Sequence, residues 1–121
     1  MTTILIADDN EDIRDMVDKM LQHHGFAVLK AATGQQAVDI AIDSHPALIL
    51  MDINMPELDG WEATSQLRKH PATADVPIIA LTAHAMVDDR PHAQQVGCNA
   101  YHTKPIDFES LLDQIVDLLV S

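Results

Sequence analysis

The sequence has one cysteine, few basic residues and no long uninterrupted apolar run. Cys98 has no second cysteine to pair with, which excludes an internal disulfide. The start of the chain lacks the basic-then-apolar pattern of a secretion signal, and its apolar runs are far shorter than the roughly 20 residues of a membrane-spanning helix. We therefore expect a soluble protein of the cytoplasm.

The shortage of basic residues also limits the kinds of partner. Nineteen acidic residues against seven basic ones give a formal net charge of −12. Such a surface repels nucleic acid and anionic lipid, so we expect neither as a direct partner. At 121 residues and 47% hydrophobic composition, the chain is large enough for one core, and we expect a single domain over residues 1–121 with no output domain.

Strand-like and helix-like hydrophobic patterns alternate five times along the chain. The predicted strands are residues 3–7, 26–31, 47–52, 76–81 and 100–103. The predicted helices follow caps at Asn10, Thr33 and Asp59, begin near residue 88 for the fourth, where Pro91 keeps it short, and follow Asp107 for the last. Strict alternation of this kind predicts a parallel sheet with helices on both faces.

Polar residues stand where the predicted strands end. The most prominent is Asp52, which directly follows the apolar run 48–51 and precedes a turn. The carboxyl ends of parallel strands share one edge, so this edge should gather five side chains: Asp8, Asp9, Asp52, Thr82 and Lys104. Three crowded carboxylates favour a bound divalent cation, and Mg²⁺ suits oxygen ligands that leave room for phosphate oxygens.

The residues at these strand ends form a recognisable series. It consists of Asp8-Asp9, then Asp52 with Met55-Pro56 and Asp59-Gly60, then Thr82-Ala83, and finally Gly97 through Tyr101 to Lys104-Pro105. In this order, and over essentially the whole chain, the series resembles the receiver domain of two-component response regulators. The resemblance implies a flavodoxin-like doubly wound (βα)5 fold with strand order 2-1-3-4-5.

The resemblance also implies a function. Asp52 would accept a phosphoryl group from a phosphohistidine on a histidine kinase or a histidine phosphotransfer protein. Asp9, Asp52 and the main-chain carbonyl of Asn54 would bind Mg²⁺ directly, and Asp8 would act through water. The chain would catalyse only its own phosphorylation and dephosphorylation, as an intermediate in signalling or in a phosphorelay.

Further residues take roles from the same resemblance. Lys104, Thr82 and Ala83 would contact the phosphate, and Tyr101 would turn inward as the face of the fourth helix, fifth strand and fifth helix changes shape. The Lys104–Pro105 peptide should be cis. Asn54 and His84 stand at positions that influence how long the phosphoryl group persists, and we hypothesise that His84 makes its loss pH-sensitive.

Several alternatives remain open at this point. The receiver could be free-standing, a relay intermediate, or a module of a hybrid histidine kinase. A Mg²⁺-dependent phosphohydrolase with an aspartate nucleophile is a rival, although Asn54 stands where such enzymes carry a second aspartate. A second rival is a pseudo-receiver that is never phosphorylated.

The remaining chemically distinctive residues are given structural roles. We expect Trp61 and the methionines to lie in the core, and Cys98 to be a small buried hydrophobe. The histidines other than His84 share no metal-ligand spacing, so surface or helix-end positions are predicted for them, including His102.

Overall fold

The computed structural model describes residues 2–55, 58–82 and 97–120. The strands are β1 (Thr3–Ala7), β2 (Ala27–Ala31), β3 (Leu48–Asp52), β4 (Ile78–Thr82) and β5 (Ala100–Thr103). The helices of the described part are α1 (Glu11–His23), α2 (Gly34–Ser44), α3 (Gly60–Lys69) and α5 (Phe108–Val120). The helix predicted near residues 88–96 lies outside the described residues.

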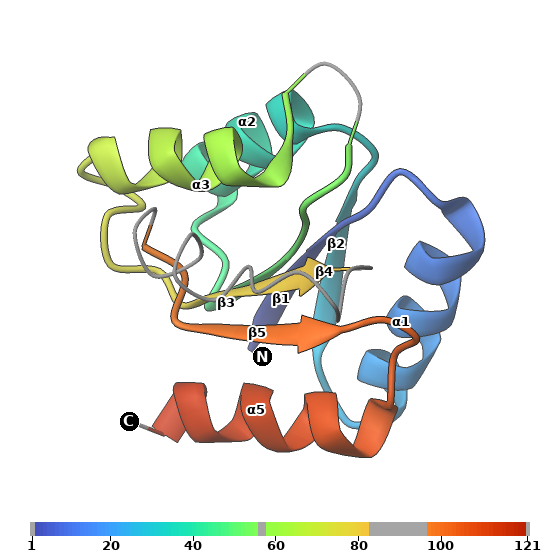
Figure 1. Ribbon diagram of the computed structural model, residues 1–121. Coiled ribbons are helices and arrows are strands. Elements are labelled where there is room, and N and C mark those ends of the chain that lie inside the picture. The colour runs from blue at the N-terminus through green and yellow to red at the C-terminus, as the bar shows by residue number, and fades with distance from the viewer. Residues whose placement is uncertain (1, 56–57, 83–96, 121) are drawn as a thin grey trace.

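The five strands form one parallel sheet in the order β2-β1-β3-β4-β5, as predicted. Figure 1 shows α2 and α3 on one side of this sheet, with α1 and α5 on the other. Strand order reverses beside β1, so the carboxyl ends of β1 and β3 flank the crevice in which α/β folds place their ligands.

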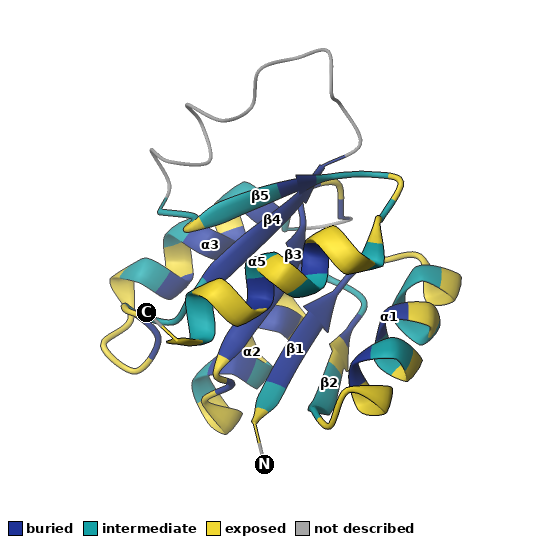
Figure 2. Ribbon diagram, turned by 90° about the horizontal axis from the view of Figure 1, so that it is seen from below, coloured by how far each residue is buried: buried dark blue, intermediate teal, exposed yellow. Residues whose placement is uncertain are grey.

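Alternate residues of each strand supply two separate cores. Leu5, Ile49 and Ile78 point toward α2 and α3, whereas their neighbours Ile4 and Leu48 point toward α1 and α5. The whole of β3 and β4 is buried, as the dark strands in Figure 2 show. Continuous apolar sequence is what a strand covered on both faces requires.

The helix starts follow the predicted caps. Asn10, Thr33 and Asp59 each accept a hydrogen bond from a main-chain N–H in the first turn of the helix that follows. β4 begins at Ile78, later than predicted, since Pro77 has no N–H to donate. The carbonyl of Pro77 still accepts a hydrogen bond from the Ile49 N–H, so the hydrogen bonding to β3 begins one residue before β4 does.

Two placements differ from the sequence expectation. Met16 on α1 is 42% exposed rather than in the core, because it lies between the buried stripe and the solvent face of an amphipathic helix. His102 is only 7% exposed, where a surface position was expected.

Trp61 is half-buried, and so is Cys98, which packs against the core. Burial raises the pKa of the Cys98 thiol, as expected for a structural rather than a redox cysteine.

Candidate functional site

Three carboxylates meet at the carboxyl edge of the sheet. Asp8 follows β1, Asp9 comes next, and Asp52 is the last residue of β3. One oxygen from each lies within 4.8 Å of the others, an arrangement that can hold a metal ion. Asp8 and Asp52 are 0% and 2% exposed, while Asp9 is exposed, so the cluster has a buried base and an open side.

Lys104 lies over this cluster from the end of β5. Its Nζ is 2.9 Å from Asp8 Oδ2 and 3.3 Å from Asp52 Oδ1. The main-chain N–H of Lys104 donates to the carbonyl of Thr82 at 2.7 Å, which continues the β4–β5 ladder past both strands. Thr82 is buried at the end of β4. The five side chains predicted at this edge thus follow four neighbouring strands.

Asp8 is fixed at every polar atom it offers. Its main-chain N–H donates to the carbonyl of Ala31, and its own carbonyl accepts from the Arg14 guanidinium at 2.7 Å. Oδ1 accepts from the N–H of Asn10 at 2.9 Å, while Oδ2 accepts from Lys104. The position of this carboxylate is therefore set before any ligand arrives.

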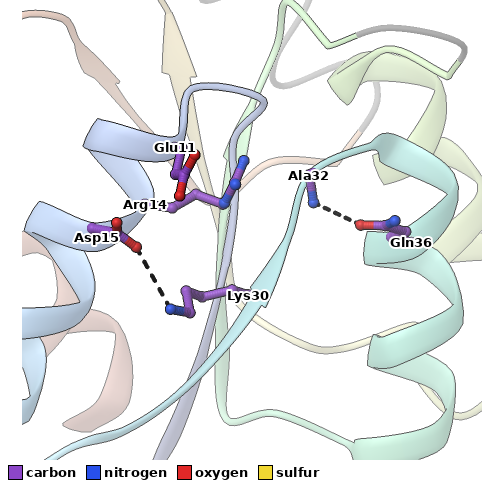
Figure 3. Close-up of a pocket in the computed structure, with 6 residues that line it drawn as sticks. All are labelled: Glu11, Arg14, Asp15, Lys30, Ala32 and Gln36. Carbon is purple, nitrogen blue, oxygen red and sulfur yellow. Dashed lines mark hydrogen bonds and ion pairs between the residues drawn. The ribbon is translucent and has the colours of Figure 1, made fainter.

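Arg14 is a contributor that the sequence reasoning did not include. It lies one turn into α1, on the side facing an open pocket of about 280 Å³ between α1, β2 and α2 (Figure 3). Lys30 and Asp15, which also line that pocket, form an ion pair at 3.6 Å. Arg14 connects the pocket to the acidic cluster through its hydrogen bond to the carbonyl of Asp8. The sequence feature that could have indicated this role is the position of Arg14 in the first turn of the helix after Asp8-Asp9.

Asp52 carries the most perturbed carboxyl of the site. Burial, followed by the negative charge of Asp8, raises its pKa from 3.8 to about 6, against the opposing effects of Lys104 and the N–H of Asn54. That N–H donates to Oδ1 at 3.2 Å. Lys104 and the Asn54 N–H thus approach the same oxygen of Asp52, Oδ1.

The charge on Lys104 is retained in this setting. Burial lowers its pKa, but the hydrogen bond and charge of Asp8 together with the charge of Asp52 outweigh that effect, so the net shift is upward. One ammonium facing three carboxylates leaves negative charge in excess. A divalent cation with oxygen ligands fits this donor set, because it neutralises the excess and lowers the cost of ionising Asp52.

The connection after Asp52 is held very close to the sheet. A Cβ on Gly60 would clash with the main-chain carbonyl of Asp52, and one on Gly34 would clash with the carbonyl of Leu58. The Gly60 N–H also donates to Ile53 at 3.0 Å. These contacts hold Ile53, the residue before Asn54, whose main-chain carbonyl was predicted to face the metal.

The other predicted site residues are placed as follows. Tyr101 is half-buried in β5, in register with Ala80 of β4. The Lys104–Pro105 peptide is cis, as predicted. Ala83, His84 and Pro91 lie outside the described residues. No helix in the described ranges is long and apolar enough to cross a membrane.

Comparison with known proteins adds an independent result. Residues 4–116 match the family described as the response regulator receiver domain. The polar-differentiation response regulator DivK of Brucella ovis is 35% identical, over 97% of this chain and 95% of the relative. Protein PilH of Pseudomonas aeruginosa is 40% identical, over 95% of each chain.

The fold also has a counterpart of known structure. The receiver domain of the sensor histidine kinase PA1611 from Pseudomonas aeruginosa superposes with a TM-score of 0.92 and 37% identity, over 99% of this chain and 98% of that one. That structure holds a magnesium ion coordinated in its active site cleft.

Proposed function

Because this chain belongs to the response regulator receiver domain family, we propose that it is a phosphoacceptor in two-component signalling, with Asp52 as the acceptor. One observation carries the proposal. Asp52 ends a fully buried strand, with Lys104 against one oxygen and two further carboxylates beside it. Two buried acids beside a third, exposed one and a single lysine destabilise a protein unless a ligand or a reaction uses them, which supports a functional role for this edge.

The residues that would hold Mg²⁺ are Asp9, Asp52 and the main-chain carbonyl of Asn54, with Asp8 acting through water. All are oxygen donors, as a hard cation prefers. Bound there, the cation would neutralise phosphoryl oxygens during transfer. Asp9 is the exposed member of the cluster, which suits a ligand that an ion reaches from solvent.

Phosphoryl transfer follows from positioning and charge. A carboxylate oxygen of Asp52 attacks phosphorus in line, and the P–N bond of the phosphohistidine breaks, with its electron pair remaining on the imidazole. Lys104 is already 3.3 Å from Asp52 and neutralises an equatorial oxygen of the phosphoryl group. Attack by water along the same line releases phosphate and restores Asp52. The donor is a histidine kinase or a histidine phosphotransfer protein.

Phosphorylation of Asp52 would then change the conformation of the surface near it. We assign phosphate contacts to Thr82 and Ala83 and an inward turn to Tyr101, which would alter the surface around β5 and α5 that protein partners read. Thr82 ends β4, and Tyr101 lies on β5, the neighbouring strand. A movement of Thr82 would therefore take place close to Tyr101. Asn54 and His84 are the proposed modulators of phosphoryl lifetime.

The test uses phosphoramidate, a small donor whose P–N bond matches that of phosphohistidine. Intact-mass spectrometry of the wild type with Mg²⁺ should show a single phosphate gained, and Asp52→Ala should gain none. Omission of Mg²⁺ should prevent the gain. Continuous turnover of phosphorylated metabolites would instead favour the phosphohydrolase, and an unmodified wild type would favour the pseudo-receiver.

A further inference from the structure

His102 makes a buried polar connection between β5 and α5. Its Nδ1 lies 2.9 Å from Gln114 Oε1, and the main-chain N–H of Asp107 donates to its Nε2 at 3.2 Å. Gln114 Nε2 donates in turn to the carbonyl of Tyr101 at 3.0 Å. We call these three hydrogen bonds the His102 clasp.

The direction of each bond in the clasp is determined. A main-chain N–H can only donate, so Nε2 of His102 accepts and carries no proton. The neutral ring is then protonated on Nδ1, which donates to Gln114 Oε1, and this leaves the amide nitrogen of Gln114 to donate to Tyr101. The nitrogens of the His102 ring and the amide oxygen and nitrogen of Gln114 therefore each act as the donor or acceptor that their chemistry allows.

Position 102 lies in an apolar part of the fold, where an apolar side chain would be the ordinary choice. His102 is paired in the sheet with Leu81, whose side chain belongs to the core beneath α5. A buried ring with unpaired nitrogens destabilises the fold, so a histidine here depends on both partners. Its specific contribution is the acceptor it offers to Asp107, whose N–H precedes the first turn of α5.

The clasp closes the connection that carries Lys104. The first end of this connection is held by the bond from the Lys104 N–H to Thr82 at 2.7 Å. The other end is held where Asp107 bonds to His102, and the carbonyl of Asp107 accepts the N–H of Leu111 in α5. Lys104 is therefore anchored on both sides, with its ammonium aimed at the acidic cluster.

We propose that His102 is a positioning residue for Lys104, acting through Asp107 to hold the β5–α5 connection during phosphoryl transfer. This inference rests on the proposed function. Removing the acceptor at His102 frees one end of the connection, and Lys104 then spends less time at the phosphoryl oxygen. Asp8 and Asp52 stay where they are, since their main-chain contacts involve Ala31, Arg14 and β4, and none of these belongs to the β5–α5 connection.

The test compares His102→Phe, which keeps a ring without nitrogens, with His102→Gln, which keeps an acceptor able to reach Asp107. The matched control is His23→Phe at an exposed position on α1. Phosphorylation by phosphoramidate is followed by intact mass, Mg²⁺ affinity by calorimetry and folding by urea titration. Gln114→Leu, which removes the hydrogen-bond partner of His102 Nδ1, serves if His102→Phe does not fold.

We expect His102→Phe to slow phosphorylation by about 5- to 10-fold while Mg²⁺ affinity stays within about twofold, because only Lys104 is displaced. His102→Gln should recover most of the rate. A His102→Phe rate equal to that of the wild type overturns the inference, as does a parallel loss of rate and Mg²⁺ affinity, which indicates general disruption. A wild type that is never phosphorylated overturns the proposed function instead.

Discussion

Lys104 Nζ lies 3.3 Å from Asp52 Oδ1, although Asp52 ends β3 and Lys104 follows β5, two strands away in the sheet. The same ammonium is 2.9 Å from Asp8, so one cation is shared by two buried carboxylates. Such sharing is favourable only while the cation is present, because an unpaired charge at a buried position is costly.

Lys104→Met should therefore reduce both stability and activity. We expect a loss of roughly 1–3 kcal/mol in the free energy of unfolding without Mg²⁺, because Lys104 is partly exposed and the carboxylates can take up protons. Phosphorylation should slow by on the order of 100-fold through loss of charge at the phosphoryl oxygens. Urea unfolding and intact mass measure the two effects.

Lys30→Met is the control for Lys104→Met. Lys30 pairs with Asp15 and Asp18 on an exposed surface, so its removal should change stability by less than about 1 kcal/mol and leave the phosphorylation rate unchanged. Equal losses from both variants would show that the acidic cluster does not depend on Lys104.

Asp52 gives the metal-free protein a specific pH dependence. Its pKa is about 6 in the fold and 3.8 ordinarily, so the native state binds more protons than the unfolded chain between these values. The contribution of Asp52 to the free energy of unfolding is therefore highest below pH 4 and falls as pH rises through 6. Asp52→Asn should remove this fall and stabilise the metal-free protein at pH 7 by roughly 1–3 kcal/mol.

The two proteins should differ least in stability at pH 4, where Asp52 is protonated in the native state and only about half ionised in the unfolded chain. Urea titrations at pH 4, 5, 6 and 7 with chelator present measure the difference. A constant difference across this range would mean that burial and Asp8 do not raise the pKa of Asp52.

Asp9 separates metal binding from folding. Its side chain is exposed, unlike those of Asp8 and Asp52, so Asp9→Asn should leave the metal-free stability within about 1 kcal/mol of the wild type. It should nevertheless remove most of the stabilisation that Mg²⁺ gives to the native state. Thermal unfolding with and without Mg²⁺ measures this, with Asp12→Asn as an exposed acidic control in the first turn of α1.

Gly34 should affect metal binding from outside the cluster. A Cβ there clashes with the carbonyl of Leu58, so Gly34→Ala must displace Leu58 or α2, and Leu58 is four residues after Asn54. We expect a loss of about 1–3 kcal/mol in stability together with weaker Mg²⁺ binding. Gly25 has a φ of 89° and no close neighbour, so Gly25→Ala should lower stability through backbone strain alone. Calorimetric Mg²⁺ titration of both variants distinguishes the two effects.

The sequence was sufficient for the fold and for most of the site because both depend on local rules. Apolar runs ending in Asp52 and Thr82 predicted parallel strands, and a parallel sheet brings the ends of its strands to one edge. Asn10, Thr33 and Asp59 predicted the helix starts because a cap acts within three residues of itself.

His102 and Arg14 could not be interpreted in the same way. The role of each depends on partners from another element, Gln114 on α5 for His102 and the carbonyl of Asp8 for Arg14. A histidine whose two nitrogens find partners only in the folded chain has no local signature. Met16 was misplaced for a related reason, since a methionine at the margin of a helix stripe can face either way.

The most direct test is to find where the phosphoryl group is attached. Borohydride reduces an acyl phosphate but not a free carboxylate, so a phosphorylated aspartate becomes homoserine, which peptide mass spectrometry locates. After phosphoramidate and Mg²⁺, the account predicts homoserine at Asp52 and at no other acid. Homoserine at Asp8 or Asp9, or a phosphate retained by the Asp52→Asn protein, would contradict it.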